Sequence, residues 1–166
     1  MMYLIIIFYS SLTFAKDKLE IEIHSKSFLN LLRLQQLAIE DKILKKEFKT
    51  KIPIIISNYK SYHKAKLGLD GLGEEHWDYD DIFNSTFDIK ISNNKFLNTF
   101  QDFRLLNKDS VYLDSSKLFN YILNFFNQPT RKYSLVDVKW VTLNNRTQYY
   151  EKVLEESFGN KILDSN

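Results

Sequence analysis

Three short segments alternate apolar and polar residues with a period of two, which is typical of strands that bury one face. They are residues 19–24, 87–92 and 135–141. Residues 54–62 begin with three isoleucines and predict a strand that is buried on both faces. In residues 28–48 and 118–126, apolar positions recur mostly at steps of three and four, and serines that can cap a helix precede each segment. These two segments therefore predict amphipathic helices.

The predicted order is strand, long helix, strand, strand, helix, strand. Alternating strands with helices on one face indicate an α+β protein, and this order names the ferredoxin-like split β-α-β sandwich (β-α-β-β-α-β). We expect this core over residues 19–143, with a long loop or hairpin at residues 63–83. Residues 1–18 then form an apolar extension or leader, and residues 144–166 form a helical C-terminal extension.

The apolar run at residues 3–14 (YLIIIFYSSLTF) leaves two alternatives open. Ala15 after it resembles the small-residue end of a secretory signal, but no Lys or Arg precedes the run. A bilayer span needs about 20 apolar residues, so the run is too short to cross a membrane. A cleaved leader and a retained, buried strand both fit, and we expect no membrane partner.

Composition narrows the function classes. With 166 residues, 44% of them hydrophobic, and a net charge of +2, the chain predicts one globular domain. The absence of Cys excludes disulfides, thiolate metal sites and a cysteine nucleophile. The chain has 13 Phe and 10 Tyr but 4 Gly and 2 Pro. Because residues with A/T-rich codons are the abundant ones, the bias indicates an A/T-rich genome such as that of an organelle.

The chain contains no phosphate-binding glycine loop, nucleophile elbow or HExxH motif. Residues 63–83 hold three of the four glycines and an acidic run at residues 74–81. His63 and His76 in this segment could gather a divalent cation, or serve a hydrolase, together with Asp78, Asp80 and Asp81. Their spacing matches no defined metal loop, so solvated charges or a partner contact are favoured. We expect no enzyme and no cofactor.

Lysines interleaved with aromatic residues recur beside the expected strands. They include Lys49, Lys51, Lys60, Lys64, Lys66 and Lys90. Such a pattern can follow a phosphate backbone, but by itself it favours an ordinary solvated surface.

Several motifs, in the same order along residues 19–143, resemble ribosomal protein S-ten of the small subunit, the NusE-like family. They are residues 21–32 (IEIHSKSFLNLL), 51–54 (KIPI), 87–91 (FDIKI), the helix at 118–126, and 136–140 (VDVKW). The resemblance implies a structural ribonucleoprotein component of the small-subunit head that binds rRNA and neighbouring ribosomal proteins. With the A/T bias, it implies an organelle-encoded member in the mitochondrial matrix. The matching positions imply rRNA contacts at Lys51, Lys60, Lys90, Asn93, Asn94 and Lys95.

The chain departs from that family at residues 63–83. The family's long hairpin is basic, whereas this segment is acidic and contains a tryptophan. We therefore expect a protein neighbour there, contacted by Trp77 and Tyr79, because large rings anchor interfaces. The alternative from another class is an exported α+β binding protein with a cleaved signal peptide. The mature N-terminus separates the two, since export predicts Lys16 as the first residue.

Overall fold

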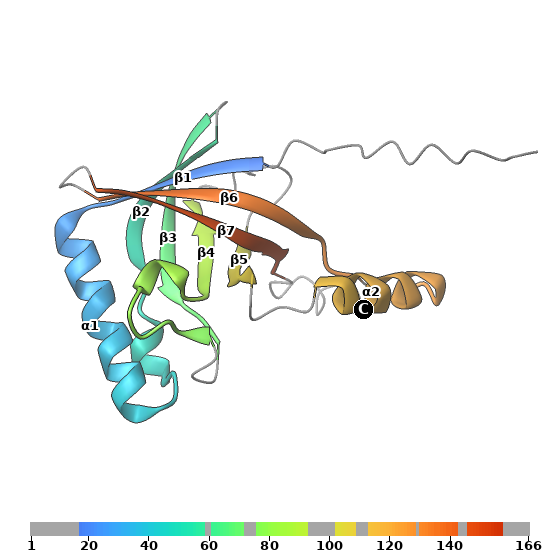
Figure 1. Ribbon diagram of the computed structural model, residues 1–166, viewed down its shortest axis with the longest axis horizontal. Helices are drawn as coiled ribbons and strands as arrows, with labels where there is room; N and C mark the ends of the chain where they lie inside the picture. Colours follow the sequence, from blue (N-terminus) through green and yellow to red (C-terminus); the bar gives the residue numbers. More distant parts are fainter. Residues whose placement is uncertain are drawn as a thin grey trace, which may run out of the picture.

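A computed structural model describes residues 17–58, 61–71, 76–92, 102–108, 113–128, 130–142 and 146–157 (Figure 1). The strands are β1 (Asp17–Ile23), β2 (Ile52–Asn58), β3 (Ser61–Leu69), β4 (Phe87–Ile91), β5 (Asp102–Asn107), β6 (Tyr133–Thr142) and β7 (Thr147–Glu156). The α-helices are α1 (Ser25–Asp41) and α2 (Leu113–Phe125), and the short 3₁₀ helices are η1 (Lys46–Lys49) and η3 (Ile82–Asn84).

The strands form a closed barrel in the order β1-β2-β3-β4-β5-β7-β6. Every neighbouring pair is antiparallel except β1 and β6, which run parallel from Asp17↔Val136 to Ile23↔Thr142. The predicted ferredoxin-like sandwich is therefore wrong. The alternating strands do have one apolar face, but that face turns inward to a barrel core instead of lying under a layer of helices.

Two strands that the sequence did not predict close the barrel. β5 pairs with β4 on one side and with β7 on the other, where Leu105 lies opposite Leu154. β7 also pairs with β6 along most of its length. The expected helical extension at residues 144–166 is wrong where the structure describes it, because residues 147–156 are strand β7. The apolar spacing of Phe96, Leu97, Phe100 and Phe103 allows a short helix in the sequence. The first three of these residues lie outside the described residues, and Phe103 belongs to β5.

The other predicted elements are present with shifted ends. β1, β4, β6 and α2 lie where the patterns predict them. The expected strand at residues 54–62 is instead a hairpin, since β2 ends at Asn58 and β3 begins at Ser61. β3 continues to Leu69, so the first part of the expected 63–83 loop is strand.

Inward side chains of all seven strands make one core. Trp140 is fully buried, and its ring centroid lies 5.1 Å from Phe83 and 5.2 Å from Phe87. Phe28 of α1 stacks on the Phe83 ring, with the two ring centroids 5.2 Å apart. α1 and η3 thus contribute to the core that the strands enclose.

α1 is shorter than the predicted helix. It begins where the His24 side chain accepts a hydrogen bond from the Lys26 backbone N–H at 3.4 Å. It ends at Lys42, whose φ of 56° is left-handed and stops the helical hydrogen-bond pattern. The chain then continues into η1, which buries Phe48 against the core. The apolar periodicity therefore persists past the helix end because a second short element uses it.

α2 differs from α1 in that its large apolar side chains are exposed. It extends away from the barrel (Figure 1). The exposed side chains of α2 and the residue after it are Leu118, Phe119, Tyr121, Ile122, Phe125 and Phe126. The helix is thus attached to the fold without being part of its core.

Candidate nucleic-acid interface

The outer surface of β3 and β4 carries a set of lysines that we call the lysine wall: Lys64, Lys66 and Lys90. Strand alternation places Lys64 and Lys66 outward on β3, because Ala65 and Leu67 point into the core. Lys90 projects outward from β4 and lies directly opposite Lys66. Like charges in directly opposed positions destabilise a sheet. The wall is therefore an unfavourable arrangement in the isolated protein.

Acidic groups near the lysine wall neutralise it only in part. Asp88 is paired with Lys51 at 2.6 Å, and Asp102 lies 3.9 Å from the Lys90 ammonium. Within the described part of the chain, no ion pair or hydrogen bond involves the Lys64 or Lys66 side chain. Positive potential therefore remains on the outer face of β3.

Gly68 allows the Lys51 ammonium to reach Asp88. A Cβ added at Gly68 would lie 3.0 Å from the Lys51 Cγ, so the lysine stem passes over the glycine. The pairing register places Asp88 opposite Gly68 on the next strand. Lys51, one of the predicted rRNA contacts, is thus engaged by an acid of its own chain.

The structure describes two of the six predicted rRNA contacts. Lys90 is exposed on the lysine wall, and Lys51 forms the ion pair with Asp88. The remaining predicted contacts, Lys60, Asn93, Asn94 and Lys95, lie outside the described residues. Lys64 and Lys66 were not among the predicted contacts, although the strict alternation of Tyr62, Lys64 and Lys66 was a usable signal of one outward face.

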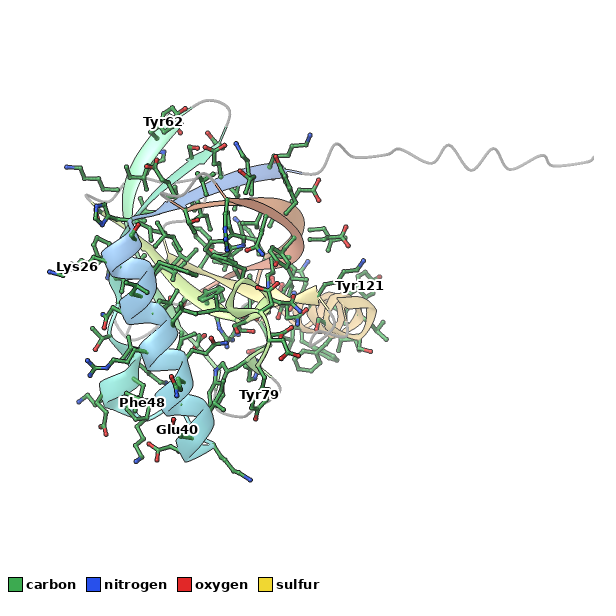
Figure 2. All side chains as sticks on the ribbon, turned by 60° about the vertical axis from the view of Figure 1, so that its left-hand side comes forward. Lys26, Glu40, Phe48, Tyr62, Tyr79 and Tyr121 are labelled. Atoms are coloured by element: carbon green, nitrogen blue, oxygen red, sulfur yellow. The ribbon has the colours of Figure 1, made fainter. Side chains whose placement is uncertain are left out.

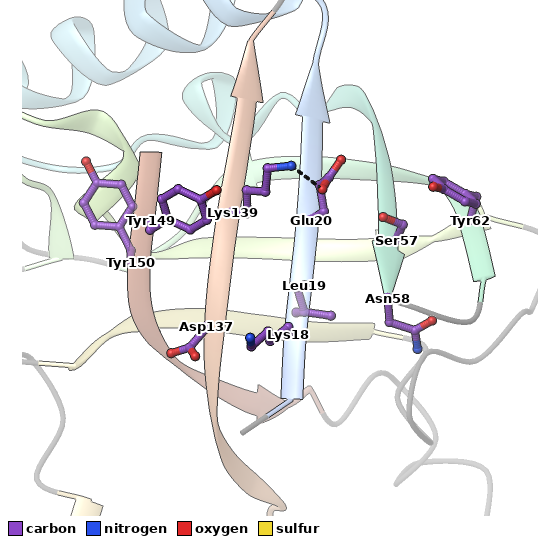
Figure 3. A pocket seen from close by; sticks show the side chains of 10 residues that line it. All are labelled: Lys18, Leu19, Glu20, Ser57, Asn58, Tyr62, Asp137, Lys139, Tyr149 and Tyr150. Atoms are coloured by element: carbon purple, nitrogen blue, oxygen red, sulfur yellow. Dashed lines mark hydrogen bonds and ion pairs between the residues drawn. The ribbon is translucent and has the colours of Figure 1, made fainter. Parts of the chain in front are cut away.

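A groove of about 650 Å³ lies beside the lysine wall, across the outside of β1 and β6 (Figure 3). One row of the sheet register crosses it over five strands. This row, which we call the tyrosine row, is Tyr62, Ser57, Glu20, Lys139 and Tyr149, from β3 through β2, β1 and β6 to β7. The two tyrosines stand at its ends, and both belong to the groove lining.

The floor of the groove is polar and its two end rings are exposed. Lys139 donates to Glu20 at 2.8 Å, and Asp137 lies opposite Lys18 in the next part of the register (Figure 3). Tyr62 and Tyr149 are 78% and 72% exposed. Two rings of this size that are not used in the core are available as stacking surfaces.

The acidic segment is folded against its own chain. Trp77 is only 3% exposed, and its indole N–H donates to the Asp70 carbonyl at 3.1 Å. The ring that was expected to anchor a protein neighbour is therefore buried within this molecule, and the structural reason for that expectation is removed. Tyr79 is exposed at the surface (Figure 2).

Asp78 organises the turn that follows Trp77. Its carboxylate accepts from the Asn84 side-chain amide at 2.8 Å and from the backbone N–H groups of Asp80 and Asp81 at 3.0 Å each. The Asn84 hydrogen bond, these backbone hydrogen bonds and the positive charge of Lys152 hold the pKa of Asp78 below its ordinary value, although partial burial opposes them. The acids of this segment therefore stabilise a local turn.

A buried lysine holds the same turn inside the barrel. Lys152 points inward from β7, is fully buried, and donates to the Ser85 carbonyl at 3.1 Å and the Asn84 side-chain oxygen at 3.5 Å. The neighbouring Tyr150 hydroxyl donates to Asp81. Burial raises the pKa of Tyr150 most, and this hydrogen bond raises it further. From α1, Gln35 donates to the Asp78 carbonyl at 2.7 Å. These contacts fix the acidic turn to β7 and α1, which is a structural role.

Two arginines are engaged in an ion-pair cluster on the outside of the barrel. Arg104 pairs with Asp70 and with Glu155, the latter at 3.0 Å. Arg131 approaches the other oxygen of Glu155 at 2.8 Å. Because these guanidinium groups already face carboxylates, the lysine wall is the better candidate for binding an anion.

No protein-family model matches the chain, and no curated protein matches it significantly. Among the described residues, no group of three or more histidine or acidic side chains is arranged to hold a metal ion, and His63 is instead hydrogen-bonded to Ser61 at 2.8 Å. No helix in the described ranges has both the length and the apolar character to cross a membrane.

Proposed function

We propose that the chain is an RNA-binding structural protein and that the lysine wall contacts the phosphate backbone. The observation that carries this proposal is the directly opposed pair of Lys66 and Lys90. Two opposed ammonium groups repel each other in the free protein. A polyanion that lies across both strands removes this repulsion and releases its own counterions.

The lysine wall suits a phosphate backbone better than a single small anion. Lys64 and Lys66 are two positions apart on one strand, a distance of about 6.7 Å at the usual rise per residue. Lys90 adds a charge on the neighbouring strand. Lysines spaced along and across a sheet neutralise several phosphates of a chain, and they carry no information about base sequence.

We propose the small ribosomal subunit of a mitochondrion as the particle to which the protein belongs. The support for this particle is the resemblance of five sequence segments to the ribosomal S-ten family, together with the A/T-biased composition. Since the barrel differs from the sandwich that this resemblance implies, the fold adds no support, and the proposal of this particle rests on the sequence alone. Neighbouring proteins of the subunit head are the expected partners besides rRNA.

The lysine wall can be tested by a double substitution, Lys64→Gln with Lys66→Gln, in the full chain. The RNA affinity is measured with a fluorescently labelled 20-nucleotide single strand over a series of salt concentrations. Each lost phosphate contact lowers the slope of log K against log salt by about 0.7 for a single strand. We expect the slope to fall by about 1.4 and the low-salt affinity to fall about tenfold or more.

A matched control removes the same charge elsewhere. Lys26 and Lys46 are exposed and belong to α1 and η1, so neither is part of the outer face of β3 and β4. The variant with Lys26→Gln and Lys46→Gln should keep the salt slope of the unmodified protein. Equal losses in the two double variants would mean that net charge, and not the lysine wall, governs binding, and the proposal would be rejected.

The particle is tested separately by sedimentation of the native protein. We expect it to sediment with ribosomal small subunits at low salt and to be released by high salt or by nuclease, because phosphate contacts are screened or removed. A native protein that stays free of ribosome-sized particles at low salt would contradict the ribosomal proposal, while leaving the RNA-binding measurement unaffected.

A further inference from the structure

The geometry of the groove points to a second element of RNA recognition: we propose that the groove binds the bases of a short single-stranded RNA segment. Tyr62 and Tyr149 are its stacking surfaces. This inference rests on the proposed RNA-binding function and adds to it the form of RNA that is bound. A backbone contact accepts any nucleic acid, whereas a stacking site requires bases that are not already paired.

The tyrosine row sets the length of the site. Tyr62 and Tyr149 are separated by four inter-strand steps, from β3 to β7. At the usual spacing of about 4.8 Å between strands, this is roughly 19 Å along the sheet. Outer faces of barrels bind single strands with site sizes that begin at about four nucleotides. The row is therefore long enough for a short segment with one base stacked at each end.

The polar groups on the floor of the groove suit the edges of bases better than they suit phosphates. Glu20 and Asp137 place carboxylates in the groove, and Glu20 is already paired with Lys139. Carboxylates repel a phosphate, but together with the Ser57 hydroxyl they can exchange hydrogen bonds with the edges of bases. Because Lys18 and Lys139 also line the groove, its charges balance, and the excess positive charge that a phosphate backbone favours lies on the lysine wall instead.

The backbone then has a place to lie next to the groove. Tyr62, Lys64 and Lys66 are successive outward residues of β3, so the stacking ring and the lysine wall share one face of one strand. A nucleotide stacked on Tyr62 brings its phosphate toward Lys64. The two features therefore form one continuous surface in which rings hold bases and ammonium groups hold phosphates, the combination used by proteins that bind single strands.

The experiment compares the affinity for an unpaired RNA with that for a paired one. The probes are a fluorescein-labelled 12-nucleotide oligouridylate and a blunt RNA duplex of equal length. The variants are Tyr62→Ala and Tyr149→Ala, with Tyr62→Phe and Tyr149→Phe as conservative replacements. The control is Tyr121→Ala on α2, since Tyr121 is as exposed as Tyr149 and lies apart from the groove (Figure 2).

We expect each alanine variant to bind the oligouridylate about tenfold more weakly, because stacking on one ring contributes about 1–3 kcal/mol. The phenylalanine variants keep the aromatic face and should bind within about twofold of the unmodified protein. Duplex affinity and the salt slope should not change, since no charge is removed. Tyr121→Ala should behave like the unmodified protein, and circular dichroism should show that every variant keeps the barrel.

The failures of the two proposals can be told apart. If the tyrosine variants bind the oligouridylate normally while the Lys64/Lys66 variant has the reduced salt slope, the groove is not a base-binding site. The proposed backbone contact of the lysine wall is then still supported. Equal losses on single-stranded and duplex RNA would also overturn the base-binding inference. If the lysine variant keeps its slope but the tyrosine variants weaken binding, the proposed backbone contact is wrong and the groove is supported alone.

Discussion

Replacing Lys152 by methionine tests whether the buried lysine anchors the acidic turn inside the barrel. Methionine keeps the length of the side chain and removes the ammonium group. The substitution leaves the Ser85 carbonyl without its donor at 3.1 Å and removes the positive charge that faces the Asp78 carboxylate. Since Lys152 is fully buried, water cannot take over these interactions in the folded barrel.

The expected cost follows from the loss of the hydrogen bonds that the ammonium group donates to the Ser85 carbonyl and the Asn84 side-chain oxygen. A hydrogen bond from a charged group contributes about 1.5–3 kcal/mol. Relief of the desolvation of the ammonium group offsets part of this, so we expect the free energy of unfolding to fall by about 3 kcal/mol. In a chain of this size, that corresponds to a melting temperature lower by roughly 6–12 °C.

The assay is urea unfolding followed by tryptophan fluorescence, which reports on the buried Trp77 and Trp140. The control is Lys139→Met, which removes a partly exposed ion pair with Glu20 and should cost no more than about 1 kcal/mol. The comparison holds only if the dependence of the unfolding free energy on urea is the same in all three proteins. A Lys152→Met protein as stable as the Lys139→Met protein would refute the anchoring role.

Two further variants test the same region. The ionised Asp78 carboxylate stabilises the fold above about pH 4, and this contribution is lost as the pH falls through its lowered pKa. Asp78→Asn removes the contribution, so the stability of the variant should depend less on pH below 4. Thermal melts from pH 2 to 7 measure this dependence. Gly71→Ala should lower the free energy of unfolding by more than about 1 kcal/mol, because Gly71 has a φ of 95° and an added Cβ would collide with the His76 ring. Alanine at an exposed position such as Lys26 should be nearly neutral.

Much of the local structure was predictable because it depends on neighbours in the sequence. The alternation in residues 19–24, 87–92 and 135–141 identifies β1, β4 and β6, since a strand that buries one face must place apolar residues at every second position. The apolar spacing after residue 118 identifies α2, but the serines expected to cap this helix lie inside it, and its large apolar side chains are exposed. In the three strands, the burial pattern and the backbone preference agree.

β7 was not predictable in the same way, and its residues explain why. Its sequence places Lys152 and Glu155 among the apolar Val153 and Leu154, so the strand has no clean alternation. Both charged residues are buried because their partners, including Ser85 and the arginines around Glu155, come from distant parts of the chain. A charged residue in a buried position is favourable only once those partners are in place.

The candidate interface shows the same division. The sequence marks Lys64, Lys66 and Lys90 as basic residues near expected strands, and it cannot distinguish them from a solvated surface. Only the register of β3 and β4 makes Lys66 and Lys90 face each other. Conversely, Trp77 was expected at a surface and is buried, because its indole N–H finds the Asp70 carbonyl within the same chain.

By itself, the sequence determined which segments are strands or helices wherever one face of an element is regularly apolar, and it determined the chemical groups that are available. The tertiary structure decided that β5 and β7 close the sheet, that Lys152 inside the barrel anchors the acidic turn, and that Tyr62 and Tyr149 end one row of five strands. The physical reason is the range of the interactions: periodicity is set by the backbone geometry of adjacent residues, whereas strand pairing and burial of charge depend on partners brought together only by folding.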